Sequence, residues 1–345
     1  MPSDVRSAAE VPRCPVRRGT STRQGFVRAG MCSSSKVTWE KRGPGLSAST
    51  DSVTRTRAGF LLHATVVVFG FTGVFGKLIA LSAVPLVFWR TLIGALGLHA
   101  WMVLRGRSTA MPRSVRWPVA LTGVLVALHW VTFFGAIKAS TVSLALAVMA
   151  TVPFFVALME PVVRRKRVDP AELGLGVVAM VGLWWMYRVD VDQWQGMALA
   201  LVSAFCAALF GTLNSVWSQK ASALAVSRLE LVVACGVLAV WITMGGGWPD
   251  AGPMPSDWGW LLLLGLLATS IAFAVTVEVM RVLSPFTVAM AINLEPIYAI
   301  LLALLVFGEE EVMPPGFYGG AALLISSVFL DVALKRRRSE RVAQG

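Results

Sequence analysis

Ten apolar runs, each long enough to cross a lipid bilayer, follow one another between residues 59 and 334. A hydrocarbon core about 30 Å thick requires roughly 20 apolar residues in helical conformation. A helix also satisfies all of its backbone hydrogen bonds within one segment, as the membrane interior demands. The sequence therefore predicts an all-α polytopic membrane protein with ten transmembrane helices. The predicted spans are 59–80, 83–104, 117–138, 140–162, 172–187, 195–216, 226–244, 258–280, 285–307 and 316–334.

The composition agrees with this class. Apolar residues (A, V, I, L, M, F, W, Y and C) make up 56% of the chain, and charged residues only 14%. About a quarter of the residues are charged in soluble domains, so a water-soluble globule is excluded. The four cysteines form no Cys-x-x-Cys pair and have no histidine at ligand spacing, which predicts neither a disulfide framework nor a zinc site. No metal or other cofactor is expected.

Lysine and arginine are concentrated on one side of the predicted bundle. Alternate connections and the C-terminal tail carry 16 of these residues, whereas the opposite connections carry Lys138 and Arg188 and end in the acidic segment 309–311. Basic residues mark the cytoplasmic side of membrane proteins. We therefore expect both termini in the cytoplasm and the protein in the plasma membrane, which is the inner membrane in a bacterium. The net charge of +12 is then a topology signal, and nucleic acid is not expected as a partner.

The chain divides into a polar tail and two apolar halves. Residues 1–57 contain 11 basic, 4 acidic and 15 Ser or Thr residues, a composition that predicts disorder. This tail is either an organelle transit peptide or an over-extended gene model that starts at Met31 or later. The second alternative is favoured because nothing in the tail pairs with the core. The predicted divisions that follow are a five-helix repeat at 58–188, a second at 189–334 and a basic cytoplasmic tail at 335–345.

The two halves repeat several features at an offset of about 140 to 143 residues. The matched features are Phe69-Gly70 with Phe210-Gly211, Lys77 with Lys220, Lys138 with Arg281, and Pro153 with Pro296. Each half has five spans, an odd number, so the two copies must cross the membrane in opposite senses. Inverted repeats of this kind are typical of secondary transporters, whose halves enclose a site near the middle of the membrane.

Four motifs, in this order, resemble a known family. They are segment 85–90 (PLVFWR), segment 284–299 (containing LEPIYA), segment 307–309 (FGE) and segment 319–325 (GGAALLI). Over residues 59–334 the chain is similar to the EamA-type repeats of the drug/metabolite transporter superfamily. The resemblance implies ten helices and the export or exchange of small metabolites. Arg164-Arg165 replaces the Gly-Glu that often closes the fourth span in this family, so no carboxylate role is transferred to that position.

Glu295 and His129 lie deepest in the predicted spans, about 10 to 12 residues from a helix end. Ionisable groups at such depth cost at least about 2.5 to 3.5 kcal/mol and are candidates for function. Either residue could carry a coupling proton. The alternatives are a neutral core histidine bonded to a backbone carbonyl, and a glutamate that hydrogen-bonds a neighbouring helix. Asn293 lies about 200° from Glu295 on a continuous helix, which predicts that the two side chains do not face one cavity.

Proline interrupts the two repeats at matching, near-central positions, Pro153 and Pro296. Each proline removes a backbone hydrogen bond, and paired interruptions indicate the binding site of a transporter. Further candidates of similar depth for the substrate pathway are Thr151, Thr269, Ser270 and Trp130. The simpler alternatives are hydroxyl groups that bond to their own helix and an indole that faces lipid or core.

Two cations near the outer ends of the first spans are further candidates. Arg90 lies about 10 Å into its span and Lys77 is shallower. Both could bind anionic groups of a substrate or extend to the headgroups. Four carboxylates near inner helix ends are expected to be structural, reaching headgroups or a partner on their own helix, such as Arg164 or Arg281. These carboxylates are Glu160, Glu230, Glu278 and Asp331.

Together these features predict a secondary transporter of small metabolites, such as amino acids or related solutes, that works by alternating access as an exporter or exchanger. Its partners would be the substrate, the lipid bilayer, and protons or a counter-substrate. No GxxxxGK[ST] motif supports direct use of ATP. A lipid or lipid-carrier flippase of similar architecture stays open as an alternative. An intramembrane enzyme is a weaker alternative, because the spans contain no HExxH, no GxSxG and no central Asp pair. Gly316 and Gly320 would permit close helix packing in a homodimer.

Overall fold

The computed structural model describes residues 47–187, 193–245, 252–298 and 315–344, and the regular elements in these ranges are all helices. Those of the first half are α1 (Ser47–Gly70), α2 (Thr72–Leu78), α3 (Ala83–Leu104), α4 (Arg113–Ala139), α5 (Val142–Met149), α6 (Val152–Arg164) and α7 (Pro170–Tyr187). Those of the second half are α8 (Trp194–Trp217), α9 (Ala223–Met244), α10 (Asp257–Leu262), the π-helix η2 (Leu263–Ala272), α11 (Phe273–Val279), α12 (Pro285–Ile292) and α14 (Pro315–Gln344). The all-α class is confirmed.

Eight of the described helical segments are long and apolar enough to cross a membrane. A ninth, Pro170–Trp185, is apolar but shorter. The predicted span 285–307 begins with α12 and continues into residues outside the described ranges, so the exact number of ten helices is not established. The acidic segment 309–311 and tail residues 1–46 also lie outside these ranges. Residues 47–57, which the sequence assigns to the disordered tail, are helical, since extending an existing helix gains one hydrogen bond per residue.

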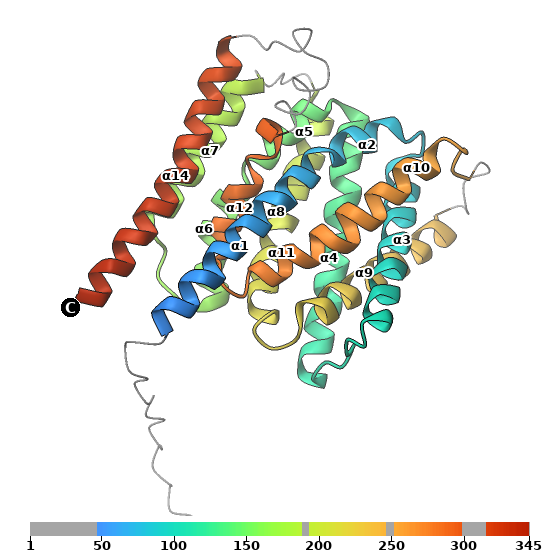
Figure 1. Ribbon diagram of the computed structural model, residues 1–345. Helices are drawn as coiled ribbons and strands as arrows, with labels where there is room; N and C mark the ends of the chain where they lie inside the picture. The colour runs from blue at the N-terminus through green and yellow to red at the C-terminus, as the bar shows by residue number, and fades with distance from the viewer. Residues whose placement is uncertain (1–46, 188–192, 246–251, 299–314, 345) are drawn as a thin grey trace, which may run out of the picture. The chain divides into compact units, whose positions relative to one another are not determined.

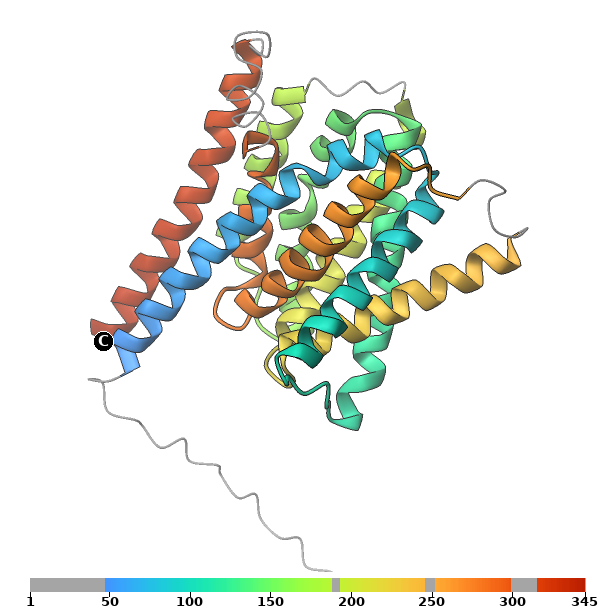
Figure 2. The ribbon, with the colours of Figure 1, turned by 45° about the vertical axis from the view of Figure 1, so that its right-hand side comes forward.

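Helices of the two halves pack against each other. α4 contacts α8 and α9, and α3 contacts α9 and η2. α7 and α14, which occupy matching places at the ends of the two halves, run side by side along one edge of the bundle (Figure 1). α1 runs beside the helix formed by η2 and α11, as Figure 2 shows. The core therefore forms between the two halves rather than within each half alone.

Each half contains a broken helix at the matching position. α5 ends at Met149 and α6 begins at Val152, which places Pro153 in the first turn of α6, where its missing N–H is not needed. α12 ends at Ile292, and Pro296 follows at the same interval. The sequence predicts interruptions at the prolines themselves. In the structure α5 and α12 end four residues before each proline, at Met149 and Ile292, because a proline has no N–H for the carbonyl four residues earlier and its ring clashes with that carbonyl.

The two breaks contact each other. Nδ2 of Asn293 donates a hydrogen bond of 3.3 Å to the carbonyl oxygen of Ala150, which lies 143 residues earlier in the chain. This separation matches the offset of the repeat, so the two residues occupy equivalent positions in the two halves. A carbonyl freed by a helix break inside a membrane needs another donor, because no lipid can supply one. The contact therefore locates the centre of the inverted repeat at the two breaks.

The close approach of α6 and α7 requires a glycine at position 176. A Cβ atom at Gly176 would lie 2.9 Å from Cα and 3.0 Å from N of Phe154, and these backbone atoms cannot rotate away. We expect Gly176→Ala to lower the free energy of unfolding by about 1 to 3 kcal/mol through overpacking. Gly174→Ala on the same helix is the control, because the space around its Cβ position is open. Unfolding in detergent measures both variants, and equal stabilities would contradict this contact.

Candidate functional site

A cavity of about 160 Å³ lies between the two halves, next to the helix breaks. A single water needs roughly 10 to 15 Å³ on the same measure, so the space holds about ten waters or a small organic molecule. Most of the lining side chains are apolar, among them Phe133, Phe210 and Phe273. The polar residues in the lining come from both halves of the chain. They are Thr72, Arg90, His129, Asn214, Thr276, Asn293 and Glu295.

Arg90 provides a cation in the lining of this cavity. It lies about two turns inside α3 and is only 3% exposed, so it does not extend to the headgroups. Its Nε and Nη2 donate to Oγ1 of Thr269 at 3.1 and 2.9 Å, and its guanidinium carbon lies 4.2 Å from the centre of the Trp130 ring. Both contacts stabilise a buried cation and fix its direction. Within the described ranges Nη1 has no hydrogen-bond partner, which leaves it free to bind an anionic group.

His129 on α4 is hydrogen-bonded to Ser203 on α8. Its Nδ1 lies 3.0 Å from the carbonyl oxygen of Ser203, and the Ser203 hydroxyl donates to the His129 carbonyl at 2.9 Å. The Ser203 hydroxyl oxygen also lies 2.8 Å from Nδ1. With that hydroxyl donating to the His129 carbonyl, a hydrogen on Nδ1 is shared between the hydroxyl and carbonyl oxygens of Ser203, which both accept. The contact is the one expected of a neutral core histidine bonded to a backbone carbonyl, and in that neutral form Nε2 is an acceptor. The residue nevertheless lines the cavity, so the structural and functional alternatives are compatible.

Glu295 and Asn293 both line the cavity, so the prediction that they face different surroundings is wrong. That prediction assumes a continuous helix, in which the two side chains would point about 200° apart. α12 instead ends at Ile292 and the chain turns at Asn293 and Leu294, so the helical phase is lost between the two side chains. No cation of the described residues lies within 4.0 Å of the Glu295 carboxylate.

The other predicted candidates separate into two groups. Pro296 and Trp130 line the cavity, and Thr269 supports it through its hydrogen bonds to Arg90. Four candidates lie elsewhere: Ser270 and Thr151 donate their hydroxyls to backbone carbonyls, Pro153 is buried in α6, and Lys77 is exposed.

Asn214 and Thr276 line the cavity but were not selected from the sequence. Asn214 is fully buried in α8, between apolar and small residues. An amide within an otherwise apolar span was the available signal, because a polar side chain at such a place needs a partner.

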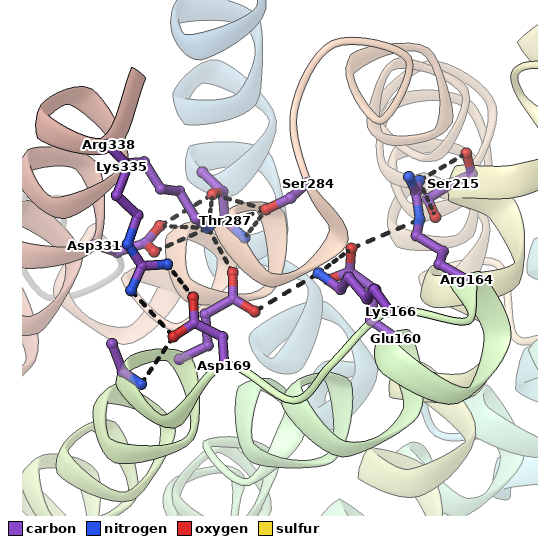
Figure 3. A network of polar contacts seen from close by, with 12 residues as sticks. Glu160, Arg164, Lys166, Asp169, Ser215, Ser284, Thr287, Asp331, Lys335 and Arg338 are labelled. Atoms are coloured by element: carbon purple, nitrogen blue, oxygen red, sulfur yellow. Dashed lines mark hydrogen bonds and ion pairs between the residues drawn. The ribbon is translucent and has the colours of Figure 1, made fainter. Parts of the chain in front are cut away.

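Ion pairs connect the two halves at the face that carries most of the basic residues (Figure 3). Lys166, just after α6, lies 2.9 Å from Glu160. Lys335 on α14 lies 2.9 Å from Asp331 on its own helix and 3.2 Å from Glu172 on α7. Lys335 also donates to the hydroxyls of Ser284 and Thr287 at the start of α12, as Figure 3 shows. The network thus joins α7 to α12 and α14.

Two of the helix-local pairs predicted from the sequence are confirmed. Arg164 lies 3.6 Å from Glu160, and Arg281 lies 3.8 Å from Glu278. Arg164 also donates to Oγ of Ser215 on α8, at 2.8 Å. Arg164, in the first half, therefore contacts a helix of the second half.

The Asp169–Arg338 pair at the basic face makes the stability of the fold depend on pH. Arg338 donates hydrogen bonds to Asp169, and these hold the pKa of that carboxyl below its ordinary value of 3.8. A lowered pKa stabilises the fold above about pH 3.8, and the stabilisation is lost as the pH falls through the lowered value.

We expect Asp169→Asn to cause a small decrease in thermal stability at pH 7, because Arg338 is exposed and Asp169 only half-buried, so solvent screens the pair. The difference from the wild type should disappear in acid. Thermal unfolding in detergent, measured from pH 7 to below pH 3.8, tests the effect. Arg337→Gln, at an exposed neighbour on α14, is the control. A difference that is independent of pH would contradict the role of the pair.

A second prediction concerns the support of Arg90. Thr269→Val keeps the shape of the side chain but removes the acceptor of two hydrogen bonds from a buried cation. We expect the free energy of unfolding to fall by about 1 to 3 kcal/mol. Thr243→Val is the control, because Thr243 is exposed and bonds only to its own helix, and it should change stability by less than about 0.5 kcal/mol. Denaturation in detergent compares them; similar losses in both would show that Thr269 does not hold Arg90.

Comparisons with known proteins agree with this architecture. The model of the EamA-like transporter family matches residues 56–188 and again residues 194–332. An uncharacterized transporter, YxxF of Bacillus subtilis (strain 168), is 21% identical over 306 residues, which cover 86% of this chain and 96% of that protein. A crystal structure of another protein has the same fold, with a TM-score of 0.66 and 17% identity over 84% of this chain and 99% of that one. The chain is therefore a multi-pass membrane protein that belongs to the EamA-like transporter family.

Proposed function

We propose that the protein is a secondary active transporter that exports or exchanges small metabolites, such as amino acids or related solutes, by alternating access. The observation that carries this proposal is the cavity between the two halves, placed where the two broken helices meet. Rocking of the halves, or bending at the breaks, would open this cavity to each side of the membrane in turn. Its volume of about 160 Å³ suits a small solute.

The charges of the cavity support a substrate with both an anionic and a cationic group. Arg90 and Glu295 both line the cavity, yet they form no ion pair with each other. A buried charge without a partner is costly, and a substrate with complementary charges would recover part of that cost. An α-amino acid has this pattern, with its carboxylate for Arg90 and its ammonium group for Glu295.

The orientation of the protein in the membrane is part of this proposal. The distribution of Lys and Arg supports cytoplasmic termini in a plasma or bacterial inner membrane, with the ion-pair network at the cytoplasmic face. The coupling partner is a proton or a counter-substrate. The order of the two repeats supports boundaries at 58–188 and 189–334. A homodimer is part of the proposal as well.

Flux in proteoliposomes tests the proposal. Purified protein is reconstituted with a panel of radiolabelled amino acids and other small metabolites, under imposed gradients of pH or of the unlabelled solute. We expect saturable flux of at least one amino acid. A fluorescent phospholipid in the same vesicles tests the flippase alternative. Absence of flux under every gradient, or movement of the lipid between leaflets, would overturn the proposal.

A narrower prediction assigns coupling to Glu295. Glu295→Gln removes the titrating group while keeping the size of the side chain, so stimulation of flux by a pH gradient should be lost. Exchange of labelled for unlabelled solute at equal pH should persist with a raised KM, because the amide still accepts a hydrogen bond from the ammonium group but carries no charge. Glu278→Gln is the control, because Glu278 is exposed at the end of α11 and pairs with a surface arginine. An unchanged pH dependence in Glu295→Gln would remove Glu295 from the mechanism.

A further inference from the structure

Glu230 is a buried carboxyl group outside the set of residues that line the cavity. It lies about two turns inside α9, which begins at Ala223. Its side chain is 0% exposed, so the prediction that it reaches the headgroups or a partner on its own helix is wrong. The cause is the crossing of α4 over α9. Gly123 of α4, which has no side chain, lies so close that a Cβ atom there would be 2.8 Å from the carbonyl oxygen of Glu230.

The carboxyl group has a single hydrogen-bond donor next to it. Nδ2 of Asn214 on α8 donates to Oε2 of Glu230 at 3.3 Å. Oε1 is buried and has no hydrogen-bond partner in the described part of the chain, and the same is true of Oδ1 of Asn214. Two neighbouring side chains thus each contain an unsatisfied acceptor. This is the pattern expected when a hydrogen is missing between polar groups.

No basic group compensates for the charge of this carboxyl. The charged and titratable groups on α9 and on the helices packed against it are Arg228 on α9, Arg90 and His99 on α3, Arg113, Arg116, His129 and Lys138 on α4, and Glu278 on α11. α8 contributes no charged residue. Every Lys, Arg and His on these helices, and on α9 itself, lies more than 4.0 Å from the Glu230 oxygens. An ionised carboxylate at this place would therefore be buried without a counter-ion, which costs several kcal/mol or more.

We infer that Glu230 is a proton-binding site of the transporter and that it holds a proton in this conformation. Binding one proton converts the carboxylate to a neutral carboxylic acid, and releasing it restores the carboxylate. The acid has one O–H donor and one carbonyl acceptor, and an amide side chain has the complementary pair of groups. Protonation therefore removes the buried charge and supplies a donor where two acceptors lack one.

The site is linked to the cavity by Asn214, which both contacts Glu230 and lines the cavity. A substrate or water that binds Asn214 would compete for its amide group and so change the proton affinity of Glu230. Proton binding and occupation of the cavity are then coupled through one side chain, and the coupling must be reciprocal. This step rests on the proposed function. Glu230 would act as a second proton-binding carboxyl in addition to Glu295, linked to the cavity through Asn214 but not part of its lining.

Infrared difference spectroscopy tests the site with the proton itself as the probe. Purified full-length protein in detergent is measured at pH 7 in H2O and in D2O. We expect a carbonyl band of a protonated carboxylic acid that shifts in D2O, that is lost in Glu230→Gln and that is unchanged in the exposed control Glu278→Gln. Asn214→Ala should shift this band without removing it, because it removes a hydrogen bond to the acid. The spectrum of Glu295→Gln shows which part of the carboxylic-acid band comes from Glu295 in the cavity.

The outcomes distinguish this inference from the proposed function. If Glu230→Gln folds and its spectrum equals that of the wild type, Glu230 is ionised and the inference is wrong. If Glu230→Gln does not fold, a wild-type acid band that Asn214→Ala fails to shift overturns the inference as well. A protein that shows the band but moves no solute of the panel contradicts the proposed transport alone. A protein that moves solute but lacks the band contradicts the proton site alone.

Discussion

A helix that breaks inside a membrane exposes carbonyl groups for which lipid offers no hydrogen-bond donor, and the rest of this fold depends on how these carbonyls are satisfied. Two breaks occur at equivalent positions, and the amide of Asn293 at one donates to the carbonyl of Ala150 at the other. Bringing the breaks together places the two halves in contact at their centre. The turn at Asn293 and Leu294 separates α12 from the helical residues that begin at Glu295, so the angle expected on one continuous helix does not apply and Glu295 can share the cavity with Asn293.

The spans were predictable because the bilayer imposes a length and the polar residues between spans mark where each one ends. α3, for example, has the predicted bounds of 83 and 104. Depth along a span was a weaker guide to the surroundings of a side chain. Glu230 and Glu278 both lie near helix ends, but one is covered by a neighbouring helix and the other is exposed. Burial depends on which helix crosses at that level, and a hydrophobic pattern does not contain that information.

The support of Arg90 shows a similar limit. Arg90 and Thr269 were both candidates, but their contact depends on the π-helical turns of η2. Thr269 and Ser270 donate their hydroxyls to carbonyls five residues earlier, at Leu264 and Gly265, as the wider π-helical turn allows. The extra residue in each turn changes which side chains of η2 face α3. A π-helix therefore alters the prediction of a helix face without changing the hydrophobic pattern from which the span was recognised.

The ionic groups of the chain separate according to whether they are paired. At the basic face, Glu160, Glu172 and Asp331 each have a lysine within 4.0 Å, so their positions are explained by the fold alone. Arg90 and Glu230 are buried, Glu295 is half-buried in the cavity lining, and none of the three has an ionic partner in the described chain. Unpaired ionisable groups inside a membrane protein are costly, so they persist where something other than the fold neutralises them. For Arg90 and Glu295 a charged solute can do so, and for Glu230, which no solute in the cavity touches directly, a proton is the simplest remaining ligand.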